Sequence, residues 1–453
     1  MRYDAIIIGA GPAGYACAIR CAKLGGQACV IEEDELGGVC TNHGCIPTKT
    51  MRSVAKAKAE ISGAQRTGLM ADASIDYERL LKHRRQVVSK SVAGIRILLE
   101  ANDVRLVKGK GKIISEDTVE VNGETLEADN IVIASGSRPS GLPGNEFDGD
   151  YILSSQDMLD LSELPSSLLI IGGGVIGVEY ASIFGNMGVE VTLVEAEDRL
   201  LPSEDTDVSS GILSILEKHA NVHISTRLAS IDKASKEAVI RTPDEEKTIQ
   251  AGKIMIATGR RPVFDATELK ALGVEADEKG VKVDDGLRTS NVRIYAVGDV
   301  TGGIMLAHAA SYQGEVAAEN IMGGQRKADV NTMPWAIFSI PEIARVGLTQ
   351  EEAEKSREIL VGVSHYAASG KARCDNHLKG FVKSIIDAGT HEILGVHIIG
   401  EAASDLIGEA ALAIRNKLNA EDVIETIHAH PTYPEMIQES LLDALSANDG
   451  QTP

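Results

Sequence analysis

Cysteine, positive charge and long apolar runs are all scarce in this sequence. Six cysteines in 453 residues are too few for the disulfide framework of a small secreted protein. The 45 lysines and arginines are outnumbered by 66 acidic residues, and the net charge of −21 argues against a nucleic-acid partner, because phosphate binding needs basic patches. No segment approaches about 20 uninterrupted apolar residues, so no membrane span is expected. We therefore expect a cytoplasmic protein, in which a close pair of cysteines is either redox-active or metal-binding.

The length and the ordinary share of apolar residues, 43%, predict two to four globular domains. The first has a clear signature in DAIIIGAGPAG, residues 4–14. A short apolar strand ends in Gly9, Gly11 and Gly14, a helical pattern follows, and the next strand ends in Glu32. Glycines in this spacing allow a tight turn, the approach of a pyrophosphate and close packing of the helix on the strand, and the acid binds a ribose hydroxyl.

The same arrangement occurs a second time in SLLIIGGGVIG, residues 167–177. Gly172, Gly174 and Gly177 are followed by a strand that ends in Glu195, and the first glycine and the acid are 23 positions apart in both units. A second echo follows, because IVIASGSRP at 131–139 resembles IMIATGRRP at 254–262. This self-similarity indicates a duplicated dinucleotide-binding unit. The first unit is about 40 residues longer, and the extra length holds the cysteine pair.

The cysteine pair lies in GGVCTNHGCIPTKT, residues 37–50. Two dinucleotide sites and two close cysteines suggest an electron relay, in which a flavin connects a disulfide to a nicotinamide. The alternatives are metal binding and buried structural cysteines. Zinc sites usually need four ligands, and the sequence has no second cysteine cluster. Five residues of ideal helix rise about 7.5 Å, whereas the Cα atoms of a disulfide lie about 4.4–6.8 Å apart. Cys40 and Cys45 therefore cannot share a regular helix, and Pro47 predicts that Cys45 lies near a helix N-terminus, where the dipole favours a thiolate.

The segment GGVCTNHGCIPTK is similar to the active-site segment of the class I flavin-dependent pyridine nucleotide-disulfide oxidoreductases. Further segments agree with this resemblance, among them ATGRRP, RIYAVGDV, PEIARVGLT and HAHPTYPE, and it extends from Tyr3 to about Ala444. Within the family, GCIPTK is most similar to the branch that oxidises dihydrolipoyl groups with NAD, whereas glutathione reductases more often have GCVPKK. The resemblance implies FAD in the first unit and NAD in the second.

The resemblance also implies the catalytic roles. Cys40 is expected to exchange with the substrate, Cys45 to face the flavin as a thiolate, and Lys49 to pair with Glu179 beside the flavin and the nicotinamide. A histidine near the C-terminus is a candidate base, because Glu435 follows His430 by five residues and can hold one imidazole nitrogen. The spacing alone leaves a structural role for this histidine open, and the resemblance favours the base.

The remaining expected site residues concern the cofactors. Asp299 is expected to bind the flavin ribityl chain with Ala307 nearby, and Leu228 and Gly259 to contact NAD. The adenosine half of FAD is expected to be bordered by Gly111, Ser135, Gly136 and Ser137.

The predicted fold class is α/β, with two Rossmann-like dinucleotide-binding domains and a C-terminal α+β dimerisation domain. We expect an FAD-binding domain over 1–145, an NAD-binding domain over 146–262, a continuation of the FAD domain over 263–327 and the dimerisation domain over 328–453. The resemblance implies a homodimer in which the histidine reaches the redox disulfide of the other subunit.

The expected reaction is the oxidation of protein-bound dihydrolipoamide. The lipoyl group would come from a carrier protein, either the acyltransferase of a 2-oxo-acid dehydrogenase complex or the carrier protein of glycine cleavage. One alternative is a related NAD(P)H-dependent disulfide or mercuric reductase, although the C-terminal segment SLLDALSANDGQTP lacks the cysteine pair of mercuric reductases. Another is a non-catalytic scaffold subunit, against which the intact set of Cys40, Cys45, His430 and Glu435 argues.

Overall fold

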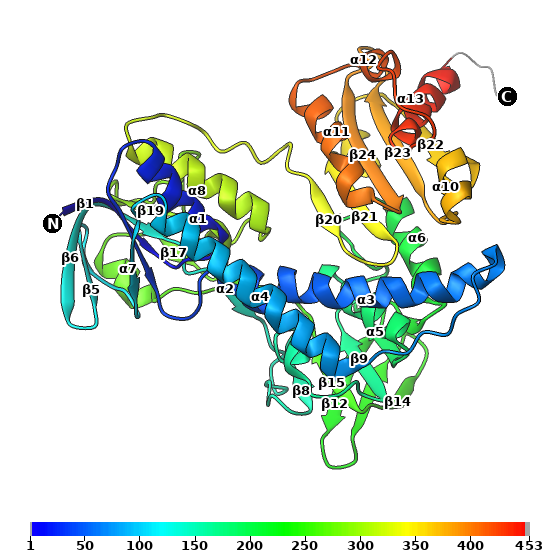
Figure 1. Ribbon diagram of the computed structural model, residues 1–453, viewed down its shortest axis with the longest axis horizontal. Coiled ribbons are helices and arrows are strands. Elements are labelled where there is room, and N and C mark those ends of the chain that lie inside the picture. The colour runs from blue at the N-terminus through cyan, green and yellow to red at the C-terminus, as the bar shows by residue number, and fades with distance from the viewer. Residues whose placement is uncertain (1, 449–453) are drawn as a thin grey trace.

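The computed structural model describes residues 2–448, which form three units (Figure 1). The predicted α/β fold class is confirmed: two sheets built mainly from parallel strands precede a C-terminal unit with an antiparallel sheet. Met1 and residues 449–453, at the ends of the first and last predicted domains, lie outside the described residues. None of the helices in residues 2–448 has the length and hydrophobicity that a membrane-spanning helix needs.

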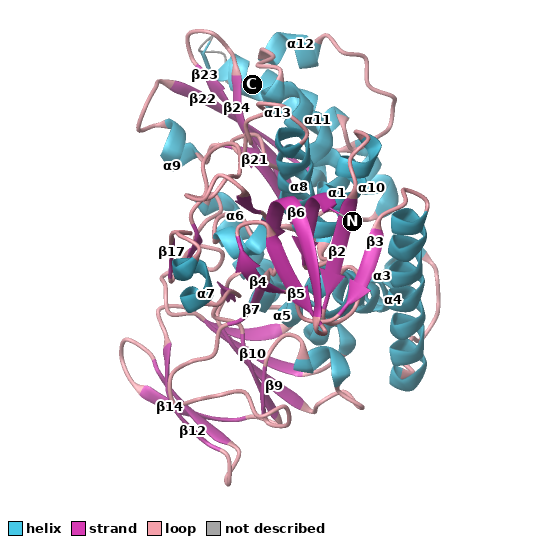
Figure 2. Cartoon of the chain, turned by 90° about the vertical axis from the view of Figure 1, so that its left-hand side faces the viewer, coloured by secondary structure: helices cyan, strands magenta, loops and turns pink. Residues whose placement is uncertain are grey.

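The first unit contains a seven-stranded sheet, in which six strands have the order β3-β2-β1-β6-β5-β4. The seventh strand, β19, pairs in parallel with the last residues of β6. Helices α1 and α8 pack together against one face of this sheet, and Figure 2 shows α3 and α4 beside it. Because β19 and α8 belong to this layer, the chain returns to the first unit after the second; the domain boundaries remain predictions. The elements are β1 (Arg2–Ile8), α1 (Pro12–Lys23), β2 (Ala28–Glu32), β3 (Arg105–Lys108), β4 (Lys112–Ser115), β5 (Thr118–Val121), β6 (Glu124–Ile133), β19 (Ile294–Ala296) and α8 (Ala307–Ile321).

The helices that carry the cysteine segment form an extension of the first unit. Helix α2 (Gly38–His43) is followed after a single residue by α3 (Cys45–Ala64), and α4 (Tyr77–Glu100) returns to the sheet. In Figure 1, α3 crosses from the first unit to the other two. Buried residues of α3, including Met51 and Ala55, pack in the same core as the second sheet and the start of the C-terminal one. The redox segment is thus anchored to all three units.

The second unit is a parallel five-stranded sheet with the order β11-β10-β9-β15-β8. Apart from its first residue, β9 is buried, as expected for a parallel strand covered on both faces. A small antiparallel sheet, β12-β13-β14, extends from this unit. The elements are β8 (Ile152–Leu153), β9 (Ser167–Ile171), α5 (Val175–Met187), β10 (Glu190–Val194), α6 (Thr206–Leu216), β11 (Ala220–His223), β12 (Arg227–Asp232), β13 (Glu237–Arg241), β14 (Glu246–Gln250) and β15 (Lys253–Ile256).

The C-terminal unit is an antiparallel sheet with the order β20-β21-β24-β23-β22, packed against α11 and α13. Every residue of β24 is buried, so this strand forms the centre of the unit. The elements are β20 (Trp335–Ile337), β21 (Glu342–Gly347), α9 (Gln350–Ala353), β22 (Ile359–His365), α10 (Gly370–Asp375), β23 (Phe381–Asp387), β24 (Ile393–Gly400), α11 (Ala403–Arg415), α12 (Ala420–Ile424) and α13 (Glu435–Asn448).

Short elements connect the units. One two-stranded sheet joins the two echoed segments, because β7 (Ser137–Pro139) pairs with β16 (Arg260–Pro262). The others are α7 (Ala266–Ala271), β17 (Ala276–Asp277), β18 (Gly280–Val281) and the 3-10 turns η1 (Gln65–Thr67), η2 (Asp157–Asp160), η3 (Gly298–Thr301) and η4 (Tyr366–Ala368).

Candidate active site

A cavity of about 1740 Å³ lies where the first unit meets α3, α5 and the start of the C-terminal unit. This volume exceeds that of a usual small-molecule pocket, about 300–1,000 Å³, and is suited to an extended dinucleotide. Of the residues expected from the sequence, the following line it: Gly9, Gly11, Glu32, Cys40, Cys45, Lys49, Gly111, Ser135, Gly136, Ser137, Glu179, Asp299 and Ala307.

The two glycine loops have matching geometry at the starts of α1 and α5. A Cβ on Gly14 would lie 1.9 Å from the carbonyl oxygen of Gly9, and one on Gly177 would lie 1.8 Å from that of Gly172, so any larger residue would separate helix from strand. A Cβ on Gly11 would meet nothing within 4 Å, and the same holds for Gly174. These open positions, at helix N-termini, fit the bound pyrophosphates expected from the motif.

The two acids that end the second strand of each unit also hold the glycine loops. Glu32 accepts hydrogen bonds from the backbone N–H of Ala10 at 2.6 Å and of Asp34 at 2.8 Å. Glu195 likewise accepts hydrogen bonds from the backbone N–H of Gly173 at 2.5 Å and of Glu197 at 2.8 Å. Each carboxylate retains lone pairs for a ribose, because one carboxylate has about four acceptor sites. In both units the acid therefore also fixes the glycine loop through hydrogen bonds, which the sequence pattern did not reveal.

The two cysteines lie on either side of a helix break. Gly44, between α2 and α3, has φ −146° and ψ −108°, far from helical values, and the two thiols come within hydrogen-bond reach although five positions separate the residues. A hydrogen bond from the Cys40 thiol is the main reason why the pKa of Cys45 falls to about 7; burial opposes this shift, and the Lys49 ammonium adds to it. The same hydrogen bond and burial raise the pKa of Cys40. Cys45 is thus the sulfur that carries negative charge first.

Lys49 and Glu179 form an ion pair one helical turn from Cys45. The lysine ammonium lies 2.9 and 3.0 Å from the two carboxylate oxygens. Glu179 is 5% exposed and belongs to α5, so the pair joins the cysteine helix to the helix of the second glycine loop. Two opposite charges at this distance stabilise each other where solvent is largely excluded.

The residues expected around a flavin fit a polar ligand. Asp299 accepts a hydrogen bond from the Ser137 hydroxyl, and that hydroxyl also accepts one from Arg260 Nε at 2.8 Å. Burial lowers the pKa of Arg260. Carboxylate, hydroxyl and guanidinium groups along one wall of a largely apolar cavity suit the sugar-alcohol chain and phosphates of FAD.

Several residues expected to contact NAD do not line this cavity. They are Gly172, Gly174, Gly177, Glu195, Leu228 and Gly259; Leu228 is half-buried against the core of the second unit. In the first glycine loop, Gly14 is also absent from the cavity lining, because it packs the helix against the preceding strand. The cavity reaches the second unit at Ser155, after β8, and at Val175, Ile176, Glu179 and Tyr180 of α5. The proposed NAD contacts therefore remain predictions.

His430 and Glu435 are in contact outside the cavity lining. Imidazole Nδ1 lies 2.7 Å from Glu435 Oε1, while Glu435 Oε2 accepts a 2.6 Å hydrogen bond from the backbone of Thr432. These bonds lower the pKa of Glu435. Pro434 directly precedes α13 and does not prevent the contact. The His430 side chain is 78% exposed, so its Nε2 is accessible from outside the chain.

Two residues at the site were not identified from the sequence. Arg260 lies in ATGRRP, which was noted as a repeat and as a segment that agrees with the family resemblance, but no role was assigned to the arginine. Phe338 lines the cavity and contacts both Lys49 and Glu179, and no motif pointed to it.

The fold and site together define an oxidoreductase with two dinucleotide-binding units and a cysteine pair. Residues 3–314 match the family model for the pyridine nucleotide-disulphide oxidoreductases, and residues 333–441 match the dimerisation domain of that family. The chain belongs to this family, whose enzymes use FAD and a pyridine nucleotide. The second match supports a homodimer.

Curated relatives span nearly the whole chain. A dihydrolipoyl dehydrogenase from Bacillus subtilis is 39% identical over 448 residues, covering 97% of this chain and 98% of that protein. One from Halobacterium salinarum is 36% identical, covering 98% and 96%. Among solved structures, LpdA from Mycobacterium tuberculosis matches with a TM-score of 0.90 at 27% identity, covering 97% and 99%. The HOCl-induced flavoprotein disulfide reductase RclA from Escherichia coli matches with 0.86 at 27% identity, with the same coverage.

Proposed function

We propose that this protein is a dihydrolipoyl dehydrogenase, which oxidises protein-bound dihydrolipoamide to lipoamide with NAD⁺. The observation that carries the proposal is the cavity in which Cys40 and Cys45 lie beside the Lys49–Glu179 pair and the N-terminal end of α5. The name shared by full-length relatives at 36–39% identity supports this substrate.

The proposed reaction begins with the cysteines joined as a disulfide. His430 Nε2 accepts a proton from one substrate thiol, and the resulting thiolate attacks Cys40 Sγ, so the Cys40–Cys45 bond breaks and Cys45 leaves as a thiolate. The second substrate thiol then attacks the sulfur bound to Cys40 and passes its proton to the departing Cys40 sulfur, while the first proton stays on His430. This releases the lipoyl disulfide and leaves Cys40 as a thiol. Glu435 orients the imidazole and stabilises its charged form.

The next stage needs a two-electron carrier next to Cys45. FAD bound in the cavity would supply it, because a flavin can take an electron pair from a thiolate and deliver a hydride to a nicotinamide. Asp299, Ser137 and the first glycine loop are the groups that would hold it. The lowered pKa of Cys45 suits the electron donor, and the Lys49 ammonium offsets negative charge beside it.

We further propose that each active site is shared between two subunits. The cysteines line the cavity, whereas His430 is exposed near α13, which in Figure 1 lies on the outer part of the C-terminal unit, away from α2. An exposed base on a dimerisation domain is positioned to serve a partner. His430 of the partner subunit would then act on Cys40. The lipoyl donor would be a carrier protein of a 2-oxo-acid dehydrogenase complex or of glycine cleavage, in the cytoplasm.

A disulfide reductase of another substrate is the second candidate, supported by the full-length structural match to RclA. Steady-state assays distinguish the two. With NAD⁺, free dihydrolipoamide should give the highest kcat/KM. For NADH-dependent reduction of glutathione disulfide or mercuric ion, kcat/KM should be lower by about 100-fold or more, because the substrate site discriminates through several specific contacts. If dihydrolipoamide is not turned over while another disulfide is, the proposal is wrong.

Cofactor preference provides a separate prediction. Glu195 is fixed by two backbone hydrogen bonds at the end of β10, where it would face an adenosine ribose. The nearby cation Arg199 is paired with Glu351 at 3.1 Å and bonded to Pro202. A 2′-phosphate would therefore meet a carboxylate without a free arginine, and kcat/KM should favour NAD⁺ over NADP⁺ by about 100-fold.

The matched variant is Glu195→Gln, which keeps an acceptor for Gly173 and removes the charge. Its preference for NAD⁺ should fall about 10-fold or more relative to the parent, mainly through improved use of NADP⁺. Equal kcat/KM values for both nucleotides in the parent enzyme would show that Glu195 does not face the ribose.

A further inference from the structure

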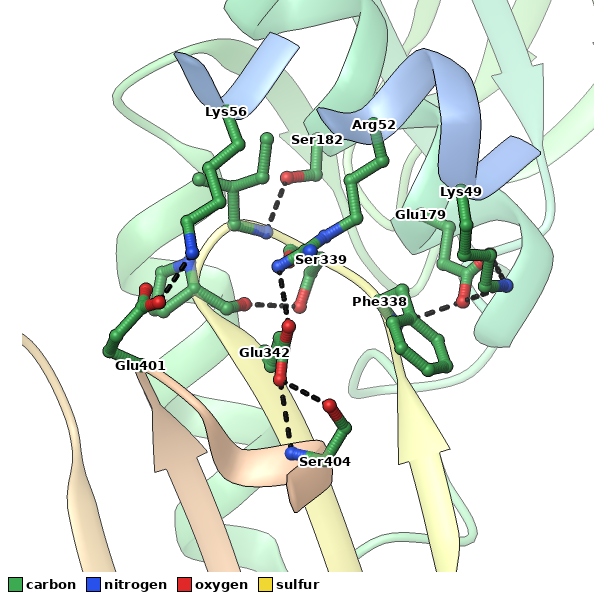
Figure 3. Close-up of polar contacts among 12 residues, drawn as sticks. Lys49, Arg52, Lys56, Glu179, Ser182, Phe338, Ser339, Glu342, Glu401 and Ser404 are labelled. Atoms are coloured by element: carbon green, nitrogen blue, oxygen red, sulfur yellow. Dashed lines mark hydrogen bonds and ion pairs between the residues drawn. The ribbon is translucent and has the colours of Figure 1, made fainter. Parts of the chain in front are cut away.

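Phe338 contacts both members of the Lys49–Glu179 pair. It follows β20, at the start of the C-terminal unit, and lies at the edge of the cavity. Its backbone N–H donates to Glu179 Oε1 at 2.8 Å, and the Lys49 ammonium lies 4.6 Å from the centre of its ring. Figure 3 shows the ring directly beside the two charged side chains. The carboxylate therefore has three N–H···O contacts, and the ammonium has an aromatic ring next to it.

The backbone that carries Phe338 is held on both sides. The Ser339 carbonyl accepts hydrogen bonds from Arg52 Nε and one terminal nitrogen, at 3.1 and 3.0 Å, and the Ile340 N–H donates to Ser182 at 2.9 Å. Arg52 lies on α3 and Ser182 on α5, and Figure 3 shows both reaching the same loop. The segment is thus fixed to the helices that carry Lys49 and Glu179.

A second ion pair continues this attachment. Arg52 lies 3.0 Å from Glu342, which accepts hydrogen bonds from the backbone and hydroxyl of Ser404 at 3.0 and 2.6 Å. One turn further along α3, Lys56 pairs with Glu401. The segment from Phe338 to Glu342 therefore belongs to the C-terminal unit but is bonded to the redox helix α3 (Figure 3).

We propose that Phe338 is a positioning residue of the redox site, whose ring and backbone amide hold the Lys49–Glu179 pair between the two dinucleotide sites. A cation over an aromatic ring is attracted by the ring's electron-rich face, and the ring also excludes water from one side of the pair. Without the ring, Lys49 would be more mobile and better hydrated. The inference deepens the proposed function, because the pair lies where electrons would pass from Cys45 toward the nicotinamide.

The state of Cys45 provides a readout for this role. The charged and titratable groups that act on Cys45 or face it are Cys40, Lys49, Glu179, Arg260 and Tyr15. Of these five groups, Phe338 contacts Lys49 and Glu179. Lys49 lowers the pKa of Cys45 more than Glu179 raises it. Loosening and hydrating the pair should therefore raise the pH at which Cys45 ionises.

The experiment uses the flavin-loaded enzyme in a Cys40→Ser background, where Cys45 is the only thiol of the pair and serine can still donate its hydrogen bond. The ionisation of Cys45 is followed against pH through its long-wavelength absorbance with the flavin and, separately, through its rate of alkylation by iodoacetamide. Phe338→Leu keeps the backbone N–H and removes the ring, and should raise the midpoint by about half a pH unit. Phe338→Tyr keeps the ring and should restore the midpoint to within about 0.2 units.

The control is Phe147→Leu, which removes a half-buried ring in the core of the second unit, away from the cavity. It should not move the midpoint, and Phe338→Met replaces Phe338→Leu if that variant does not fold. An unchanged midpoint in the ring-deleted variant, or an equal shift in the control, would overturn the positioning role. If the parent shows no long-wavelength band but its alkylation still titrates, the flavin relay fails, and alkylation alone decides the role of Phe338.

Discussion

Equal amounts of inactive Cys45→Ser chains and inactive His430→Ala chains should regain roughly a quarter of parental activity once their subunits exchange. Random exchange makes half of the dimers mixed, and each mixed dimer would contain one intact site and one doubly damaged site. Before mixing, loss of the base alone should reduce kcat/KM by about 100- to 10,000-fold. The physical reason is that the cysteines and His430 come from different units and, in our proposal, from different chains.

The measurement is dihydrolipoamide oxidation before and after exchange, with the mixed dimer verified by intact mass. A mixture of two preparations of His430→Ala, one of them mass-labelled, provides the control for handling and should stay inactive. If mixed dimers form and activity does not return, His430 acts on its own chain or is not the base.

Replacing Cys45 by serine should abolish turnover, with a fall in kcat of about 1,000-fold or more. The flavin should remain bound, but the long-wavelength absorbance that a reduced parent enzyme shows should be lost, because it depends on a thiolate beside the flavin. The pKa of Cys45 is lowered to about 7, so the thiolate is present above that pH and is lost as the pH falls through it.

The Cys40→Ser variant is the matched control for this prediction. It lacks the exchanging sulfur, so it should be equally inactive, yet it should show the long-wavelength absorbance without added reductant once the pH is high enough to ionise Cys45. Absorbance that persists in Cys45→Ser and disappears in Cys40→Ser would reverse the roles of the two cysteines.

The parts of the site that depend on local backbone geometry were predictable from the sequence. Glycine spacing indicated both dinucleotide loops, since a Cβ at Gly14 or Gly177 would clash with the carbonyl of Gly9 or Gly172, directly after the preceding strand. The spacing of Cys40 and Cys45 required a break in the helix, which the structure has at Gly44. Such constraints act over a few residues and therefore leave a pattern in the sequence.

Contacts between distant segments could not be predicted in this way. Phe338 is 159 positions from Glu179, and a single phenylalanine after a short strand has no distinguishing pattern. The hydrogen bonds that the glycine loops donate to Glu32 and Glu195 were missed for another reason: the motif already assigned these acids to a ribose. Where His430 acts depends on how two chains assemble, which the residues of one chain do not determine.

The most direct test of the relay is an anaerobic titration of the flavin-loaded enzyme with dihydrolipoamide, followed by NAD⁺. The account predicts that about one equivalent of the dithiol per subunit produces the long-wavelength absorbance, because a disulfide accepts one electron pair. Added NAD⁺ should then remove the absorbance and form NADH in comparable amount. A flavin spectrum that dihydrolipoamide leaves unchanged, in an enzyme that NADH readily reduces, would contradict the proposed substrate and point to a reductase of another disulfide.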